Sequence, residues 1–179
     1  MIIKIIGLFH LFHSPLLVLF PFIVKTFTTD ILYISYFFAI MFLYTFVNGE
    51  CPISYVCKII IDKNYIAGSN ITYYPEMEYL LQNKKTINYY FGTMTFLYIK
   101  ILFFVIFRTN TMSYILFFVF VLLFNYFLLV RDYFSIKNRI YFIIFQEITK
   151  YILFLTIYFL LKLVPFEINH VQASNYAKI

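Results

Sequence analysis

Long apolar runs constrain this chain more than any other feature. Five stretches of about 17 to 24 residues, each poor in charge, are long enough for the roughly 20 residues that a helix needs to cross a bilayer. None of them alternates like a barrel strand. The sequence therefore predicts an all-α fold, a polytopic transmembrane helix bundle that forms a single membrane domain over residues 1–179. The expected spans are residues 5–24, 31–47, 89–107, 112–130 and 141–164, the last closed by Pro165.

Composition agrees with this fold and excludes several classes of protein. Hydrophobic residues make up 63% of the 179 residues and charged residues only 12%, against roughly a quarter charged in a soluble domain. The net charge is +6, but the 14 cationic residues lie scattered at the ends of apolar runs. We therefore expect the lipid bilayer as a partner and no nucleic acid. No phosphate-binding loop, nucleophile elbow or zinc-protease motif occurs.

The cationic residues divide unequally between the two sides of the predicted spans. Because cationic residues near spans are retained in the cytoplasm, the amino terminus and the segment 48–88 should be cytoplasmic and the carboxyl terminus lumenal or external. If the first run does not cross, the tail lies inside and the segment 48–88 stays cytoplasmic. The richer side holds Lys4, Lys58, Lys63, Lys84, Lys85, Arg131, Lys137 and Arg139, and the other holds Lys25, Arg108 and Lys178, with Lys162 near the boundary.

The hydrophilic segment 48–88 concentrates Pro, Gly, Cys and acidic residues that are rare elsewhere. Its opening Asn-Gly pair predicts a turn that ends the second span, and residues 55–61 are apolar enough to lie along the bilayer interface. Pro75 indicates the first turn of a short helix. We expect this segment to be a contact surface, with Asn48, Gly49, Glu50, Cys51, Pro52, Gly68, Pro75 and Glu76 as its principal residues.

Polar residues at one end of the spans are candidates for chemistry. His10 and His13 are three residues apart and share a helix face. With Glu50 and Cys51 they are the candidate catalytic residues near one interface. The two histidines could also bind a metal with Glu50 or Asp30, while the simpler interpretation is that neutral imidazoles hydrogen-bond inside the bundle.

The two cysteines, Cys51 and Cys57, lie on the same segment. In a reducing cytoplasm we expect free thiols without special reactivity. Two thiolates without a third and fourth ligand do not complete a tetrahedral zinc site. The sequence therefore predicts no metal site and no cofactor.

The stretch Asn48-Gly49-Glu50-Cys51-Pro52-Ile53-Ser54, just after the second span, resembles the Cys-Pro-Leu-Thr segment of the DUF2784 family of small bacterial membrane proteins of unknown function. It departs from that pattern at Ile53 and Ser54, and the chain has no tryptophan. The whole chain, rich in Phe, Ile, Tyr and Asn, is also similar to membrane proteins encoded by large DNA viruses with AT-rich genomes. Neither resemblance implies a catalytic residue.

Two hypotheses about function follow. The first is a non-enzymatic membrane protein, structural or assembly-related, that binds other membrane proteins or a second copy of itself through the segment 48–88. The second is a small membrane enzyme or carrier that acts on lipid or protons through polar residues at the interface. The lack of a complete catalytic constellation in the sequence favours the first.

Overall fold

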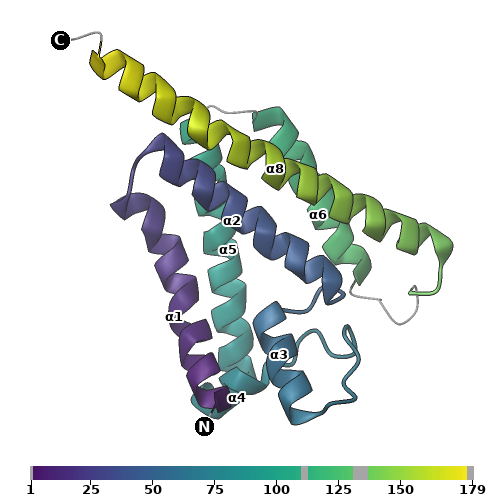
Figure 1. The fold of residues 1–179 in the computed structure, drawn as a ribbon. Coiled ribbons are helices and arrows are strands. Elements are labelled where there is room, and N and C mark those ends of the chain that lie inside the picture. The colour runs from purple at the N-terminus through teal and green to yellow at the C-terminus, as the bar shows by residue number, and fades with distance from the viewer. Residues whose placement is uncertain (1, 110–112, 131–136, 177–179) are drawn as a thin grey trace.

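The chain folds as a bundle of α-helices (Figure 1). The computed structural model describes residues 2–109, 113–130 and 137–176, and these ranges contain helices and no strand, which confirms the predicted all-α class. Residues 110–112 and 131–136, which include Arg131 and parts of the stretches between the predicted spans, lie outside the described residues, as does Lys178. The helices are α1 (Ile2–Ile23), α2 (Phe27–Phe46), α3 (Pro52–Ile61), α4 (Pro75–Leu81), α5 (Lys84–Thr109), α6 (Ser113–Val130) and α8 (Ile140–Tyr176).

A long helix lies at each of the five predicted runs, but most are longer than the apolar pattern. Helix α2 begins at Phe27 because Thr26 and Thr29 form a capping box, each side chain accepting the other's backbone N–H. Helix α5 begins at Lys84, where the Asn83 side chain accepts the N–H of residue 85 at 2.9 Å. The apolar part of the last helix ends at Val164, directly before Pro165 as predicted, but the helix itself continues beyond the proline to Tyr176.

Four helices of the described chain are long and apolar enough to cross a membrane: α1, α2, α5 and the part of α8 from Ile140 to Val164. The described apolar part of α6, Leu116–Val130, is shorter. Soluble monomers rarely expose large contiguous apolar patches, yet these helices point many large apolar side chains outward. By length and composition they are the helices of an integral membrane protein. Among the exposed side chains are Phe12, Leu16, Phe107, Phe118, Tyr151 and Phe154.

Helix α2 lies at the centre of the bundle, packed along α8 and against α5 (Figure 1). Its Ile34 and Phe38 are fully buried with Leu102 of α5 and Leu153 of α8. Helices α5 and α6 are in contact, and the ring centroids of Phe103 and Phe120 lie 4.9 Å apart. The core is thus built from bulky side chains, in keeping with a chain that has four glycines.

At one end of the bundle an arginine joins three helices. The Arg108 guanidinium of α5 donates from Nε to Asp30 Oδ2 of α2 at 2.7 Å, from Nη2 to the other carboxylate oxygen, and from Nη1 to the Pro21 carbonyl of α1 at 3.0 Å. Pro21 lies eleven residues, or roughly 16 Å, along α1 from His10. Asp30 is therefore committed to Arg108, and the alternative of a metal site shared by Asp30 and the histidines is wrong.

At the opposite end, α1 packs closely against α4 (Figure 1). Gly7 permits this approach, because a Cβ atom at that position would lie 2.5 Å from the carbonyl oxygen of Glu76. His10 is one turn farther along α1 and on the same face. The only helical glycine of α1 thereby brings the first candidate residue of the site beside α4.

Candidate functional site

Three buried side chains from distant parts of the sequence form a hydrogen-bonded chain. His10 Nδ1 donates to Glu76 Oε1 at 2.8 Å, and Cys51 Sγ lies 3.6 Å from His10 Nε2. Ser54 Oγ donates to the same Glu76 oxygen at 2.5 Å. With its Nδ1 proton held by the carboxylate, the imidazole presents the Nε2 lone pair to the thiol, which is the tautomer that a general base needs. The arrangement is that of a nucleophile, a base and an orienting acid.

Local sequence places each member. Asn48 and Gly49 adopt positive φ angles of 53° and 83°, so the chain turns sharply after α2. Cys51 then occupies the N-cap of α3, directly before Pro52 at the first helical position. Glu76 follows Pro75 in the first turn of α4, where an acidic side chain suits the helix dipole. The predicted turn and the predicted helix start at Pro75 are confirmed, whereas the helix start at Pro52 was not predicted.

The surroundings of Cys51 favour its thiolate. Burial by itself raises the pKa of the Cys51 thiol, but the hydrogen bond between the thiol and His10, together with hydrogen bonds from the Ser54 backbone N–H and the Tyr44 hydroxyl, outweighs it. The pKa therefore lies below that of an ordinary cysteine. The helix N-terminus at α3 acts in the same direction. Other titratable groups that interact with Cys51 are Tyr44, Cys57, Lys58 and Tyr74.

Cys57 differs from Cys51 although both are free and buried. Burial, with smaller contributions from the charges of Glu76 and Cys51, raises the pKa of the Cys57 thiol to about 11. No hydrogen bond to Cys57 lowers it. The prediction of two thiols without special reactivity therefore fits Cys57, whereas Cys51 has an activating environment.

Glu50 belongs to a separate buried cluster. Its Oε2 lies 3.2 Å from Lys58 Nζ, both side chains being almost fully buried, and its Oε1 accepts from the Tyr65 hydroxyl and from the Asn70 backbone N–H. Lys58 also donates to the Asn70 carbonyl at 2.6 Å. Burial lowers the pKa of Lys58 although Glu50 opposes the shift, and burial together with the hydrogen bond to Glu50 raises that of Tyr65 to about 12. This cluster fastens the loop 62–74 to α3.

A cavity of about 620 Å³ adjoins the cysteine and the imidazole, which both line it. That volume lies in the usual range for small-molecule sites. His13 lines the same cavity but points to Tyr36, whose hydroxyl is 2.6 Å from His13 Nε2. Both histidines therefore hydrogen-bond inside the bundle, His10 to Glu76 and His13 to Tyr36. Only His10 also reaches the thiol.

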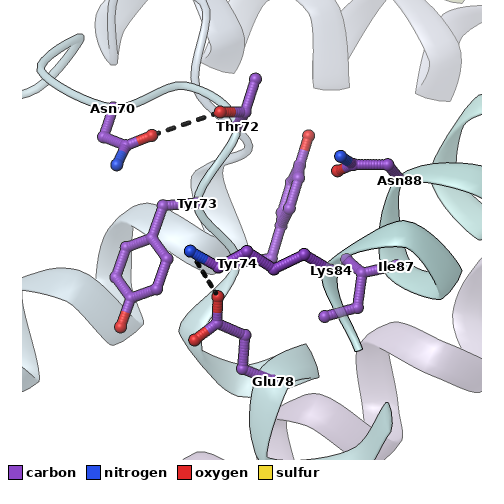
Figure 2. Close-up of a pocket in the computed structure, with 8 residues that line it drawn as sticks. All are labelled: Asn70, Thr72, Tyr73, Tyr74, Glu78, Lys84, Ile87 and Asn88. Atoms are coloured by element: carbon purple, nitrogen blue, oxygen red, sulfur yellow. Dashed lines mark hydrogen bonds and ion pairs between the residues drawn. The ribbon is translucent and has the colours of Figure 1, made fainter. Parts of the chain in front are cut away.

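A second, smaller cavity of about 110 Å³ is lined mainly by polar side chains (Figure 2). Asn70 Oδ1 accepts from the Thr72 hydroxyl at 3.3 Å, and Lys84 Nζ pairs with Glu78 at 3.9 Å. Tyr74 lines both this smaller cavity and the large cavity. Its ring stacks on Phe91 with centroids 4.3 Å apart. One aromatic residue therefore borders an apolar space and a polar one.

Most of the residues expected on a contact surface lie inside the fold. Glu50, Cys51, Gly68, Pro75 and Glu76 are buried, and Asn48, Gly49 and Pro52 are half-buried. The structure brings together His10 and Cys51 among the four catalytic candidates and places Glu50 and His13 in other contacts.

Sequence reasoning assigned no chemistry to Glu76 and did not single out Ser54 or Tyr44. Glu76 and Glu78 are equivalent in the sequence pattern, and only packing against α1 distinguishes them. The one available signal was position: Glu76 follows a helix-starting proline at the same polar end of the chain as Cys51.

Within the described residues no group of three or more His, Cys, Asp or Glu side chains has a geometry that could hold a metal ion. The chain matches no protein-family model, and comparisons with curated proteins and with solved structures return no match.

Proposed function

We propose that this protein is a membrane enzyme that transfers or hydrolyses acyl groups, with Cys51 as nucleophile. One observation carries the proposal: the His10 imidazole is hydrogen-bonded to the Glu76 carboxylate through Nδ1 and to the Cys51 thiol through Nε2. Such a chain is the general device for activating a weak nucleophile.

In this proposal each residue has one role. His10 Nε2 takes the proton of the Cys51 thiol as the sulfur attacks an acyl carbon. Glu76 holds the imidazole in the required tautomer and stabilises the imidazolium. His10 then returns the proton to the leaving group, and a thioester at Cys51 remains until water or a second nucleophile removes the acyl group.

Ser54 positions Glu76 through its hydroxyl. Helix starts leave N–H groups without a partner inside the helix. At the start of α3, Pro52 has no N–H and the Ser54 N–H already contacts the Cys51 sulfur. The Ile53 N–H is therefore the group beside Cys51 that is suited to stabilise negative charge on the acyl oxygen in the transition state.

The charge distribution supports an orientation that suits this chemistry. We infer that the amino terminus and the segment 48–88 lie in the cytoplasm, with the carboxyl terminus on the lumenal or external side. A reducing cytoplasm keeps Cys51 as a free thiol. The bilayer around α1, α2 and α5 is then the nearest partner of the site.

The test is direct capture of the thioester. Full-length protein in vesicles is incubated with a short soluble acyl donor, the pentynoyl thioester of N-acetylcysteamine, and the alkyne is detected after protein separation. We expect label on wild-type protein and on Cys57→Ser, none on Cys51→Ser, and removal by neutral hydroxylamine. Equal labelling of Cys51→Ser and wild type would overturn the proposal.

Partner binding through the segment 48–88 remains a second candidate, because one observation favours it. The outer face of α3 exposes the apolar side chains of Val56, Ile60 and Ile61. This face suits the bilayer interface or another membrane protein, including a second copy of the chain. The burial of Glu50, Cys51 and Glu76 instead favours chemistry inside the fold. Exchanging Val56 and Ile60 for serine should abolish partner recovery without changing thioester capture at Cys51.

A further inference from the structure

The cavity beside Cys51 is elongated and changes character along its length. Four helices trace it in the same direction, from the thiol end toward the middle of the bundle. On α1 it extends from Phe9 to Leu17, and on α2 from Tyr44 back to Tyr36. On each helix the two residues are eight positions apart, which is roughly 12 Å along the helix axis. The cavity is therefore a slot with its reactive group at one end.

Away from the thiol, the walls of this slot are mainly apolar, although the polar side chains of His13, Ser14, Tyr36, Thr95 and Tyr98 also line it. Helices α2, α5 and α6 contribute chiefly aliphatic and aromatic side chains, including Phe37, Ile40, Met94, Ile99, Leu123 and Phe127. The proposed nucleophile and base, Cys51 and His10, lie together at one end of the slot, beside Tyr74. A molecule that fits such a slot has a long apolar part and a reactive carbon at its end.

The slot opens on the apolar outer surface of the helices. Phe9 of α1, Leu43 of α2 and Phe124 of α6 all line it and are nevertheless 58%, 51% and 58% exposed. Two of these helices are long enough to span the membrane. The opening is therefore on the lipid side, where a hydrocarbon chain can enter without crossing water.

We propose that the slot binds the acyl chain of a bilayer lipid ester and that this chain is the group transferred to Cys51. The inference rests on the proposed function. A hydrocarbon advances about 1.3 Å per carbon, because C–C bonds are about 1.5 Å long, so roughly nine carbons fill the slot. The ester carbonyl then reaches the thiol.

The step balances without a redox partner. The Cys51 sulfur forms a bond to the ester carbonyl carbon, and its proton passes to His10 Nε2. The bond from that carbon to the ester oxygen breaks, and the imidazolium returns the proton to the departing alcohol oxygen. The products are an acyl thioester on Cys51 and a lysolipid.

The experiment presents full-length protein with two donors. One is a vesicle made of phosphatidylcholine whose acyl chain has eight, twelve or sixteen carbons and ends in an alkyne. The total lipid concentration is the same for each chain length. The other is the short soluble pentynoyl thioester. We expect hydroxylamine-sensitive label from the lipid on Cys51, absent from Cys51→Ser, together with release of lysolipid.

Chain length and a slot variant test the binding mode. Soluble acyl thioesters lengthened from two to eight carbons should label faster by up to about fourfold per added carbon, with little further gain beyond roughly ten. Ala39→Phe, which narrows the slot from α2, should lower lipid labelling at least about tenfold and lower labelling by the shorter pentynoyl thioester by a smaller factor. Leu32→Phe, on the exposed face of the same helix, is the control that should change neither.

The outcomes separate the two proposals. Label from the short donor but none from the lipid, or a labelling rate independent of chain length, would overturn the lipid inference while leaving the thiol chemistry intact. No label at Cys51 from any donor would overturn both. The chain-length series uses the unaltered protein, so it decides the question even if Ala39→Phe does not fold.

Discussion

Gly7 sets the distance between His10 and Glu76, so a single methyl group there should disable the site. A Cβ at Gly7 would lie 2.5 Å from the Glu76 carbonyl oxygen and 3.0 Å from a Leu80 methyl carbon. Ordinary contact begins at 3.4 Å, so the α4 backbone must retreat by the difference, about 0.9 Å. The His10–Glu76 hydrogen bond of 2.8 Å would then lengthen to about 3.7 Å, beyond hydrogen-bonding range.

The strain of Gly7→Ala should cost about 1 to 3 kcal/mol. The control is Gly92→Ala in α5, where a Cβ meets nothing within 4 Å. Alanine favours helix by about 0.5 to 1 kcal/mol, so that control should be neutral or stabilising.

Both variants are made in the Cys57→Ser background and compared by thermal unfolding and by the iodoacetamide alkylation rate of Cys51. Gly7→Ala should lower both the melting temperature and the rate, and Gly92→Ala neither. If Gly7→Ala behaves like Gly92→Ala, the reasoning about the α1–α4 contact is refuted.

Three further predictions concern the other clusters. Glu50→Gln or Lys58→Met alone leaves one buried charge unpaired and should cost about 3 to 5 kcal/mol, whereas the double variant should recover much of the loss, as measured by denaturant unfolding in micelles. Arg108→Lys keeps the charge but loses the bidentate contact with Asp30, and should lower stability by about 1 to 3 kcal/mol. A melting temperature equal to that of wild type would contradict a stabilising role for the contact between Arg108 and Asp30. Glu76→Gln should slow thioester formation at Cys51 at least about tenfold without abolishing it, whereas unchanged single-turnover rates would remove Glu76 from the mechanism.

Local rules predicted much of the fold. Apolar length located the long helices, and the Asn-Gly pair and Pro75 marked a turn and a helix start that the structure contains. The helix ends were missed where side chains extend the helix beyond the apolar run, as at Thr26 and Asn83. Hydropathy does not record such caps.

The site was only half predictable. Spacing placed His10 and His13 on one face, and composition drew attention to Cys51, but 66 residues separate His10 from Glu76. Their pairing depends on the close packing of α1 on α4 at Gly7, and no periodicity in the sequence encodes which helices meet. Glu50, beside Cys51 in the sequence, turns instead to Lys58 because adjacent residues at a helix start point in different directions.

The most direct test of the central claim, that His10 activates Cys51, is the pH dependence of alkylation in proteins with one cysteine. Cys57→Ser, which retains Cys51, should react with a midpoint below that of an ordinary thiol, and Cys51→Ser, which retains Cys57, only near pH 11. Adding His10→Gln to Cys57→Ser should move the Cys51 midpoint upward, because a hydrogen bond that favours the thiolate is lost, and each unit of upward shift should lower the rate at neutral pH about tenfold. The account would be contradicted if the pH midpoint of Cys51 alkylation equalled or exceeded that of an ordinary thiol. It would also be contradicted if His10→Gln did not change that midpoint.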